Sequence, residues 1–186
     1  MGWLKAIDDV NYVKGLADEM GGADRVKRQH DGGRYTVRER MEKFCDPGSF
    51  LEMGHLIGAA DYDAEGNLVE FSPGGYVMGL GEISGRPVSV GGDDFTLSGG
   101  SPHDVHKLPH HFAQPLALQY GLPYVQLREG VGHSSKQDEQ DGHMGLPQGD
   151  LWHQGVELLS NVPVAAAILG SVAGWPATAA LLSHFT

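Results

Sequence analysis

Residues 162–182 read VPVAAAILGSVAGWPATAALL, an apolar run followed by a glycine-rich turn and a second apolar segment. The run Val162–Leu169 predicts a buried strand, because it has no polar residue and is shorter than most helices. The glycines of Gly170–Gly174 predict a tight turn, and Trp175–Leu182 predicts a helix after it. A strand that runs through a small turn into a helix is typical of an α/β sheet.

The same pattern occurs earlier in the chain. The apolar segment Leu122–Leu127 runs into the glycine turn Gly130–Gly132. Helical patterns lie on either side of it, at Pro102–Tyr120 and Leu151–Leu159. Prolines at positions 109 and 115 should kink or split the first of these helices. The alternation of helix and strand predicts right-handed crossovers over a sheet, and therefore an α/β domain.

The first 50 residues have a different pattern. Apolar residues at helical spacing predict a helix over residues 7–21. Thr36 and Glu39 match the capping-box pattern of a second helix, which should end at Phe44 before a turn. We therefore expect a helical amino-terminal arm at residues 1–50.

Strands and turns follow the arm. Three β-rich segments lie between residues 55 and 92, and they are His55–Tyr62, Gly75–Ile83 and Arg86–Val90. The break at Ser84-Gly85 predicts that the last two form a hairpin. With the crossovers that follow, these strands predict a second region, residues 51–186, that forms the α/β domain.

The composition limits the function. The 186-residue chain has a formal net charge of −11, and the charge is uneven. Residues 1–43 carry nine basic and eight acidic side chains, whereas the remaining residues carry four basic and 16 acidic ones. A protein that binds duplex nucleic acid would be expected to carry a basic face, so we expect no nucleic acid partner. The apolar run after Val162 is broken by glycine and proline before it could span a bilayer, so we expect no membrane partner.

Cys45 is the only cysteine, which excludes an internal disulfide and a zinc ribbon built on paired cysteines. It lies just before Asp46-Pro47, so we expect it at the buried end of a helix. A structural role is favoured over a nucleophile, because no histidine lies near it in the sequence. The first nine residues lack the apolar core of a signal peptide. These features predict a cytoplasmic location or an equivalent reducing compartment.

Three glycine turns are the candidates for chemistry. Ser98-Gly99-Gly100 follows a predicted strand, as do Gly130-Val131-Gly132 and Ala173-Gly174. Ligands collect at the carboxyl ends of strands in open α/β sheets, where such turns expose backbone N–H groups. A cluster of N–H donors suits chemistry in which a carbonyl oxygen gains negative charge. A plain turn stays the alternative for each of the three.

The histidines offer a rival interpretation. Four of them fall on one predicted helix at spacings that can bind zinc, and they are His103, His106, His110 and His111. Pro109 interrupts that helix, and no glutamate follows the first histidine as in metalloproteases, so we expect no resident metal. His133 lies beside a glycine turn and is a candidate for a pocket.

The chain has many candidate backbone donors and few side-chain catalysts. The Gly-x-Ser-x-Gly elbow of hydrolases is absent, and Asp93 and Asp94 should point to opposite faces if extended. This profile favours a reaction whose acid–base chemistry comes from a substrate or a cofactor.

A longer stretch carries a family resemblance. Residues 21–40 read GGADRVKRQHDGGRYTVRER and are followed by DPGSF at residues 46–50. This run resembles the opening of the carboxyltransferase (beta) subunit of biotin-dependent acyl-CoA carboxylases, such as the propionyl- and methylcrotonyl-CoA enzymes. Later segments are similar in the same order, and they are Gly81–Pro87, Asp94–Thr96, Gly99–Ser101, Leu122-Pro123 and Val162-Pro163. The resemblance extends from about residue 20 to the end.

The resemblance implies a crotonase-like (ClpP/crotonase) ββα superhelix and carboxyl transfer from carboxybiotin to the α-carbon of an acyl-CoA thioester. The family holds the thioester enolate on backbone amides, here those of Val131 and Gly132. It implies contacts with the acyl-CoA for the residues around these amides, which are Ser98, Gly99, Gly100, Gly130, His133, Ala173 and Gly174. The basic candidates for the CoA phosphates are Arg25, Lys27, Arg28 and Arg34. A solvated arm is an equal alternative for these cations.

One departure from the family concerns the oxyanion turn. The usual Asp-Ser-Gly-Gly-Ala-Arg aligns with residues 129–134, so that Val131 replaces the first glycine of the pair and the arginine is lost. A β-branched residue disfavours positive φ, so a different hole geometry is expected.

Family members are longer chains with two related halves. The resemblance therefore implies partners: a biotin carboxylase or biotin carrier subunit, the second carboxyltransferase half and further copies in a homo-oligomer. We expect this chain to be a fragment, a truncated gene product or one component of a split enzyme, with residues 51–186 incomplete at their carboxyl end. The alternatives are a crotonase-type acyl-CoA decarboxylase and a non-catalytic CoA-binding or assembly subunit.

Overall fold

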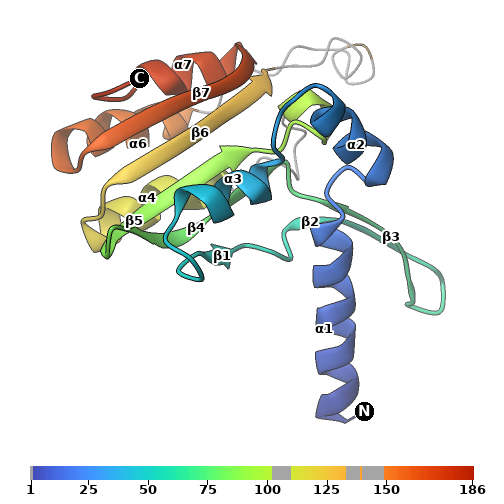
Figure 1. Ribbon diagram of the computed structural model, residues 1–186. Helices are drawn as coiled ribbons and strands as arrows, with labels where there is room; N and C mark the ends of the chain where they lie inside the picture. The colour runs from blue at the N-terminus through green and yellow to red at the C-terminus, as the bar shows by residue number, and fades with distance from the viewer. Residues whose placement is uncertain (1, 102–109, 133–138, 140–148) are drawn as a thin grey trace.

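The computed structural model describes residues 2–101, 110–132, 139 and 149–186. Its main element is a five-stranded sheet with the order β1-β4-β5-β6-β7 (Figure 1). Antiparallel pairing joins β1 to β4 and β4 to β5, and parallel pairing joins β5 to β6 and β6 to β7. The strands are β1 Leu51–Met53, β4 Tyr76–Ile83, β5 Arg86–Asp93, β6 Tyr124–Val131 and β7 Val164–Ala173.

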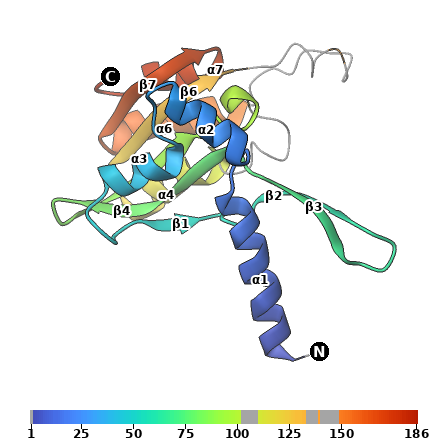
Figure 2. The same ribbon diagram turned by 45° about the vertical axis from the view of Figure 1, so that its right-hand side comes forward.

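Helices cover both faces of this sheet. On one face, α4 (His110–Tyr120) and α6 (Gly149–Asn161) pack over side chains such as Tyr76 and Tyr124. On the other face, α3 packs through Val37 and Met41 over side chains such as Val90 (Figures 1 and 2). The helices that follow the arm are α4 His110–Tyr120, α6 Gly149–Asn161 and α7 Trp175–Leu181. Successive residues of a strand point to opposite faces, so β6 contributes alternately to the two cores.

The amino-terminal helices are α1 Trp3–Asp18, α2 Ala23–Asp31 and α3 Val37–Phe44. The capping box at the start of α3 is confirmed: Glu39 N donates to Thr36 Oγ1, and Thr36 N donates to the Glu39 carboxylate. Cys45 ends α3 and is buried, as expected, and burial raises the pKa of its thiol. α3 therefore belongs to the core, whereas α1 projects away from the sheet (Figure 1).

A second, two-stranded sheet lies beside α1. It consists of β2 Gly58–Tyr62 and β3 Leu68–Pro73, paired antiparallel. The predicted strand His55–Tyr62 corresponds to β2, but the pattern did not reveal β3. This hairpin points away from the main sheet (Figure 2).

Some element boundaries differ from the sequence-based expectations. Helix α1 begins at Trp3 rather than residue 7, and α2 was not predicted as a helix. Pro115 lies inside α4 without splitting it. Strands β5, β6 and β7 each run several residues further than predicted, because their pairing continues into the glycine-containing segments. No helix in the described residues is long and apolar enough to cross a membrane.

Candidate functional site

The three glycine turns meet at one end of the sheet. A Cβ atom added to Gly100 would lie 2.7 Å from the Glu129 carbonyl oxygen and 2.8 Å from Gly130 Cα. A Cβ added to Gly132 would lie 2.7 Å from the Ala173 carbonyl oxygen. Real side chains do not tolerate such distances, so these glycines let backbone pack directly on backbone. The structure thus brings together three segments that the sequence separates.

The valine in the central turn is not strained. Val131 ends β6 in extended backbone and pairs with Ala173 of β7. The positive φ of 56° falls on Gly132, and Gly174 opposite it has a φ of 60°. Glycine adopts such angles without steric cost. The predicted conflict between a β-branched residue and positive φ is therefore wrong, because the left-handed position lies one residue later.

A pocket of about 320 Å³ opens beside the first turn. The arm forms one wall, and the segment after β5 forms the other. Its lining residues are Arg25, Arg28, Gln29, Arg34, Phe95, Thr96, Ser98 and Gly99. Three of the four predicted arm cations, Arg25, Arg28 and Arg34, thus lie with two of the predicted turn residues. Lys27 is not among the lining residues, and it pairs with Asp31 at 2.6 Å on the exposed side of α2.

The charge of this pocket is only partly compensated. Arg34 lies over the Phe95 ring at 5.0 Å and donates a hydrogen bond to Glu129 at 2.8 Å. Arg25 and Arg28 form no ion pair with any carboxylate in the described part of the chain. Unpaired guanidinium groups that face one cavity are suited to binding phosphate or carboxylate.

Buried charges lie directly beneath the central turn. Arg128 points to the face of the sheet that packs against α4 and α6, where it donates to Asp93 at 3.0 Å and to Gln126. Burial by itself would lower the pKa of Arg128, but the carboxylate of Asp93 more than offsets it and raises that pKa. Glu129, the next residue, points to the arm face and is fully buried.

The two aspartates at the end of β5 diverge, as expected. Asp93 bonds Arg128, whereas Asp94 accepts hydrogen bonds from the backbone N–H and the hydroxyl of Thr96 at 2.9 and 2.6 Å. Burial raises the pKa of both carboxyl groups. Thr96 Oγ1 also accepts from the backbone N–H of Gly21 at 2.9 Å. This chain of contacts fixes the loop after β5 against the arm.

The histidine candidates are not resolved by this geometry. His103, His106 and His133 lie outside the described residues, and only the backbone of His110 and His111 is described, at the start of α4. The zinc alternative and the pocket role of His133 therefore stay predictions.

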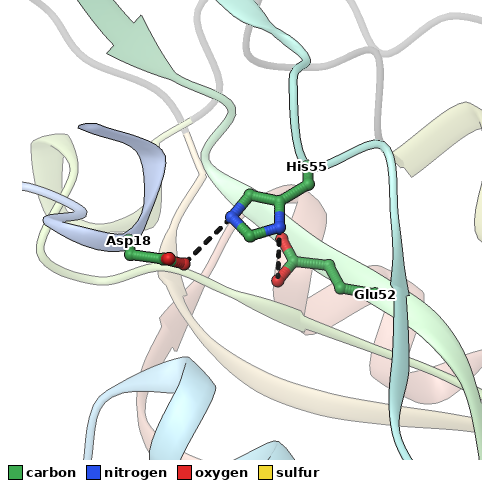
Figure 3. Close-up of side chains that lie close together, drawn as sticks. All are labelled: Asp18, Glu52 and His55. Carbon is green, nitrogen blue, oxygen red and sulfur yellow. Dashed lines mark hydrogen bonds and ion pairs between the residues drawn. The ribbon is translucent and has the colours of Figure 1, made fainter. Parts of the chain in front are cut away.

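A different His–carboxylate group lies at the base of α1 (Figure 3). Ligand atoms of Asp18, Glu52 and His55 lie within 4.8 Å of one another. The imidazole stands between the carboxylates, with Nε2 2.9 Å from Asp18 and Nδ1 3.7 Å from Glu52. A bound zinc ion would need each ligand atom to lie about 2.0–2.2 Å from one common point. Arg38 also pairs with Glu52 and lies 3.5 Å from Asp18, so the geometry favours an ion-pair network.

Comparisons with known proteins agree with the fold and the site. The family model "Carboxyl transferase domain" matches residues 28–186. This chain belongs to the carboxyl transferase domain family. It is 30% identical over 181 residues to the carboxyltransferase subunit of propionyl-CoA carboxylase from Haloferax mediterranei, which covers 97% of this chain and 34% of that protein. It is also 30% identical over 165 residues to the methylmalonyl-CoA decarboxylase subunit alpha of Veillonella parvula, covering 89% and 32%.

The structural comparisons confirm the crotonase-like α/β fold. Transcarboxylase 12S, in a crystal structure with methylmalonyl-coenzyme A and methylmalonic acid bound, matches with a TM-score of 0.81 at 27% identity and covers 100% of this chain and 36% of that one. The beta subunit of Pseudomonas aeruginosa geranyl-CoA carboxylase matches with a TM-score of 0.75 at 21% identity, covering 97% and 33%, and supports the fold alone. The chain spans about a third of the length of these relatives.

Sequence reasoning missed the residues that support the turns. Gln29, Arg34 and Arg40 gather around the buried carboxylate of Glu129, and of these four only Arg34 had been assigned a role, as a candidate for the CoA phosphates. A signal was present, because the charged pair Arg128-Glu129 lies inside a strand that follows the apolar segment Leu122–Leu127. A charged pair in a strand covered on both faces must find buried partners.

Proposed function

We propose that this chain is the acyl-CoA-binding component of a biotin-dependent carboxyltransferase, which moves a carboxyl group from carboxybiotin to the α-carbon of an acyl-CoA thioester. The observation that carries the proposal is the meeting of three glycine turns beside a pocket with two arginines, Arg25 and Arg28, that form no ion pair among the described residues. Turn amides suit an enolate oxygen, and guanidinium groups suit the phosphates of CoA.

In this proposal the reaction centre lies at the central turn. The backbone amides of Val131 and Gly132 hold the thioester oxygen while it carries the negative charge of the enolate. Gly130 and Gly132 have no side chain, so the Gly100 backbone packs against the first and the backbone of Ala173 and Gly174 packs against the second, which forms that surface. His133 stands next to the donors in the sequence and is assigned to the same site.

The phosphate end of the substrate is assigned to the arm. Arg25 and Arg28 provide charge-assisted hydrogen bonds, and Ser98 and Gly99 belong to the opposite wall, with Gly100 following them in the same turn. Lys27 pairs with Asp31 and contributes only to the long-range field.

Carboxybiotin, carried by a partner, supplies the carboxyl group and takes up the α-proton. The shortage of side-chain bases around the turns is consistent with such a division of labour. The family model describes carboxyl transfer, so a crotonase-type decarboxylase without biotin and a non-catalytic CoA-binding subunit are not favoured.

The test is calorimetric binding of propionyl-CoA to the chain. Replacing Arg25 and Arg28 together by glutamine should weaken binding at least tenfold, because two charge-assisted contacts are lost. Lys27→Gln is the control on the same helix, since it removes one charge outside the pocket where the double variant removes two inside it, and it should change the dissociation constant less than twofold. Equal effects of the two changes would contradict the phosphate assignment, and no binding by the folded wild-type chain would contradict the proposed function.

The partners are also proposals. A carrier of biotin, its carboxylase and a second carboxyltransferase half would complete the reaction, since the relatives are about three times longer. The transcarboxylase 12S relative is described as a hexamer, which supports a homo-oligomer. A single buried thiol supports a reducing compartment such as the cytoplasm. The division into an arm at residues 1–50 and a domain at residues 51–186 stays a prediction.

A further inference from the structure

Glu129 makes contacts with two helices of the arm. Its carboxylate accepts a hydrogen bond from Gln29 Nε2 at 2.7 Å and one from Arg34 Nη1 at 2.8 Å. Arg40 Nη2 donates a third, charge-assisted bond. These donors are 89 to 100 residues away in the sequence, and the carboxylate has no exposed surface. One side chain of the sheet therefore joins α2, α3 and the segment between them.

The surroundings are shaped around this carboxylate. A Cβ added to Gly170 of β7 would lie 2.3 Å from Glu129 Oε1, so a glycine is needed at that position. Arg40 also reaches the Leu169 carbonyl oxygen at 3.5 Å. Because a buried charge is costly unless it is paired and hydrogen-bonded, the arm and the sheet are stable in this arrangement only together.

The backbone of Glu129 belongs to the site. Its N–H donates to Asp93 Oδ2 at 3.2 Å, and its carbonyl oxygen packs against Gly100. The next residues are the turn Gly130–Gly132. A displacement of Glu129 would therefore move the central turn relative to the turn that contains Gly100.

Arg34 connects the same carboxylate to the pocket. It lines the cavity with Arg25 and Arg28, and Glu129 fixes its guanidinium over the Phe95 ring. Arg40, in contrast, does not line the pocket and reaches it only through Glu129.

We propose that Glu129 is a positioning residue that couples docking of arm residues 29–40 to the geometry of the turn Gly130–Gly132. This inference rests on the proposed function only for the identity of the ligand. Since coupling is reciprocal, loosening the arm weakens ligand binding, and ligand binding stabilises the arm.

The experiment compares two arginines of α3. Arg40→Met removes a bond to Glu129 at a residue that does not line the pocket. Arg38→Met is the matched control, because Arg38 is also largely buried but pairs with Glu52 on the other side of the helix. In calorimetric titrations with propionyl-CoA, R40M should raise the dissociation constant at least fivefold and R38M less than twofold, at temperatures where both variants are folded. Equal shifts would overturn the proposal.

A second measurement needs no ligand. Amide hydrogen exchange in residues 126–132 should be at least tenfold faster in R40M than in the wild type and unchanged in R38M. If R40M does not fold, Arg40→Lys replaces it and should give a smaller change in the same direction. Unchanged exchange in the turn of a folded Arg40 variant would overturn the coupling, even if the wild-type chain binds acyl-CoA as proposed.

Discussion

Two ion-pair groups join the arm to the rest of the chain, and both pair arginines with carboxylates in different surroundings. The inner group holds Glu129 between Arg34 and Arg40, and the carboxylate is 0% exposed. The outer group holds Asp18 beside His55 (Figure 3) and within ion-pair distance of Arg38. The Asp18 carboxylate is 55% exposed.

Water screens the exposed carboxylate of Asp18, so its pairing contributes little, whereas the inner carboxylate depends on its partners for solvation. The comparison teaches that the burial of a charge, rather than the number of its contacts, decides how much its ion pairs contribute to docking of the arm. The inner group holds α2 and α3 against the sheet, and the outer group orients the projecting helix α1.

The largest effect is expected from Glu129→Ala. Removing the carboxylate leaves Arg40 buried without its partner, which should lower the free energy of unfolding by about 3–5 kcal/mol. Urea unfolding followed by circular dichroism measures this change. Glu82→Ala is the control, since Glu82 is exposed, and it should change stability by less than about 0.5 kcal/mol. A loss below 1 kcal/mol for Glu129→Ala would remove the contrast between the two groups.

The next effect concerns the close packing of the turns. Gly132→Ala should cost about 2–3 kcal/mol, because alanine is strained at positive φ and its Cβ would meet the Ala173 carbonyl oxygen at 2.7 Å. Gly121→Ala has nearly the same φ, 61°, with no atom within 4 Å of the added Cβ, and should cost only about 1–2 kcal/mol.

The difference between these two alanine variants isolates the approach of the two strands. Thermal unfolding measures it, and titration with propionyl-CoA should show weaker binding for Gly132→Ala alone. If the two alanine variants had equal stabilities and equal affinities, Gly132 would not pack against Ala173 and Gly174 as described.

The outer group should respond weakly. Asp18→Asn removes one exposed charge from the pairs with His55 and Arg38, and the expected loss of stability is below about 1 kcal/mol. Denaturant unfolding in low and in 0.5 M salt measures it, and the difference from the wild type should shrink in high salt. A loss as large as that of Glu129→Ala would mean that exposure does not separate the two groups.

The smallest effect concerns the capping box formed by Thr36 and Glu39 at the start of α3. Burial by itself would raise the pKa of Glu39, but hydrogen bonds from His30 and Thr36 outweigh it and lower that pKa. The stabilisation is therefore present above the ordinary value of 4.5 and is lost as the pH falls through the lowered folded-state pKa.

Glu39→Gln should remove this part of the acid dependence, with a change of roughly 0.3–0.5 kcal/mol after solvent screening. Unfolding curves between pH 3 and pH 6 measure it. Parallel acid profiles of Glu39→Gln and the wild type would contradict the assignment of the bonds.

Local elements could be predicted wherever the decisive contacts lie close together in the sequence. The capping box of α3 joins residues three positions apart, and the helix after Gly174 follows from its own pattern. Helix α2 was missed because its sequence is polar and carries no apolar stripe, and its stability comes from packing and from Gln29. Strand β3 was missed because its only strand partner is β2 in a small exposed hairpin.

The sequence by itself determined the family, the strand–turn–helix units and the candidate glycines, because these depend on short-range backbone preferences and on a long characteristic run. The tertiary structure decided that the three turns meet, that Arg25 and Arg28 face one pocket while Lys27 does not, and that Glu129 is buried under the arm. These contacts join residues that are up to 100 positions apart. Their existence depends on sheet order and register, which bring distant residues together and which no local pattern encodes.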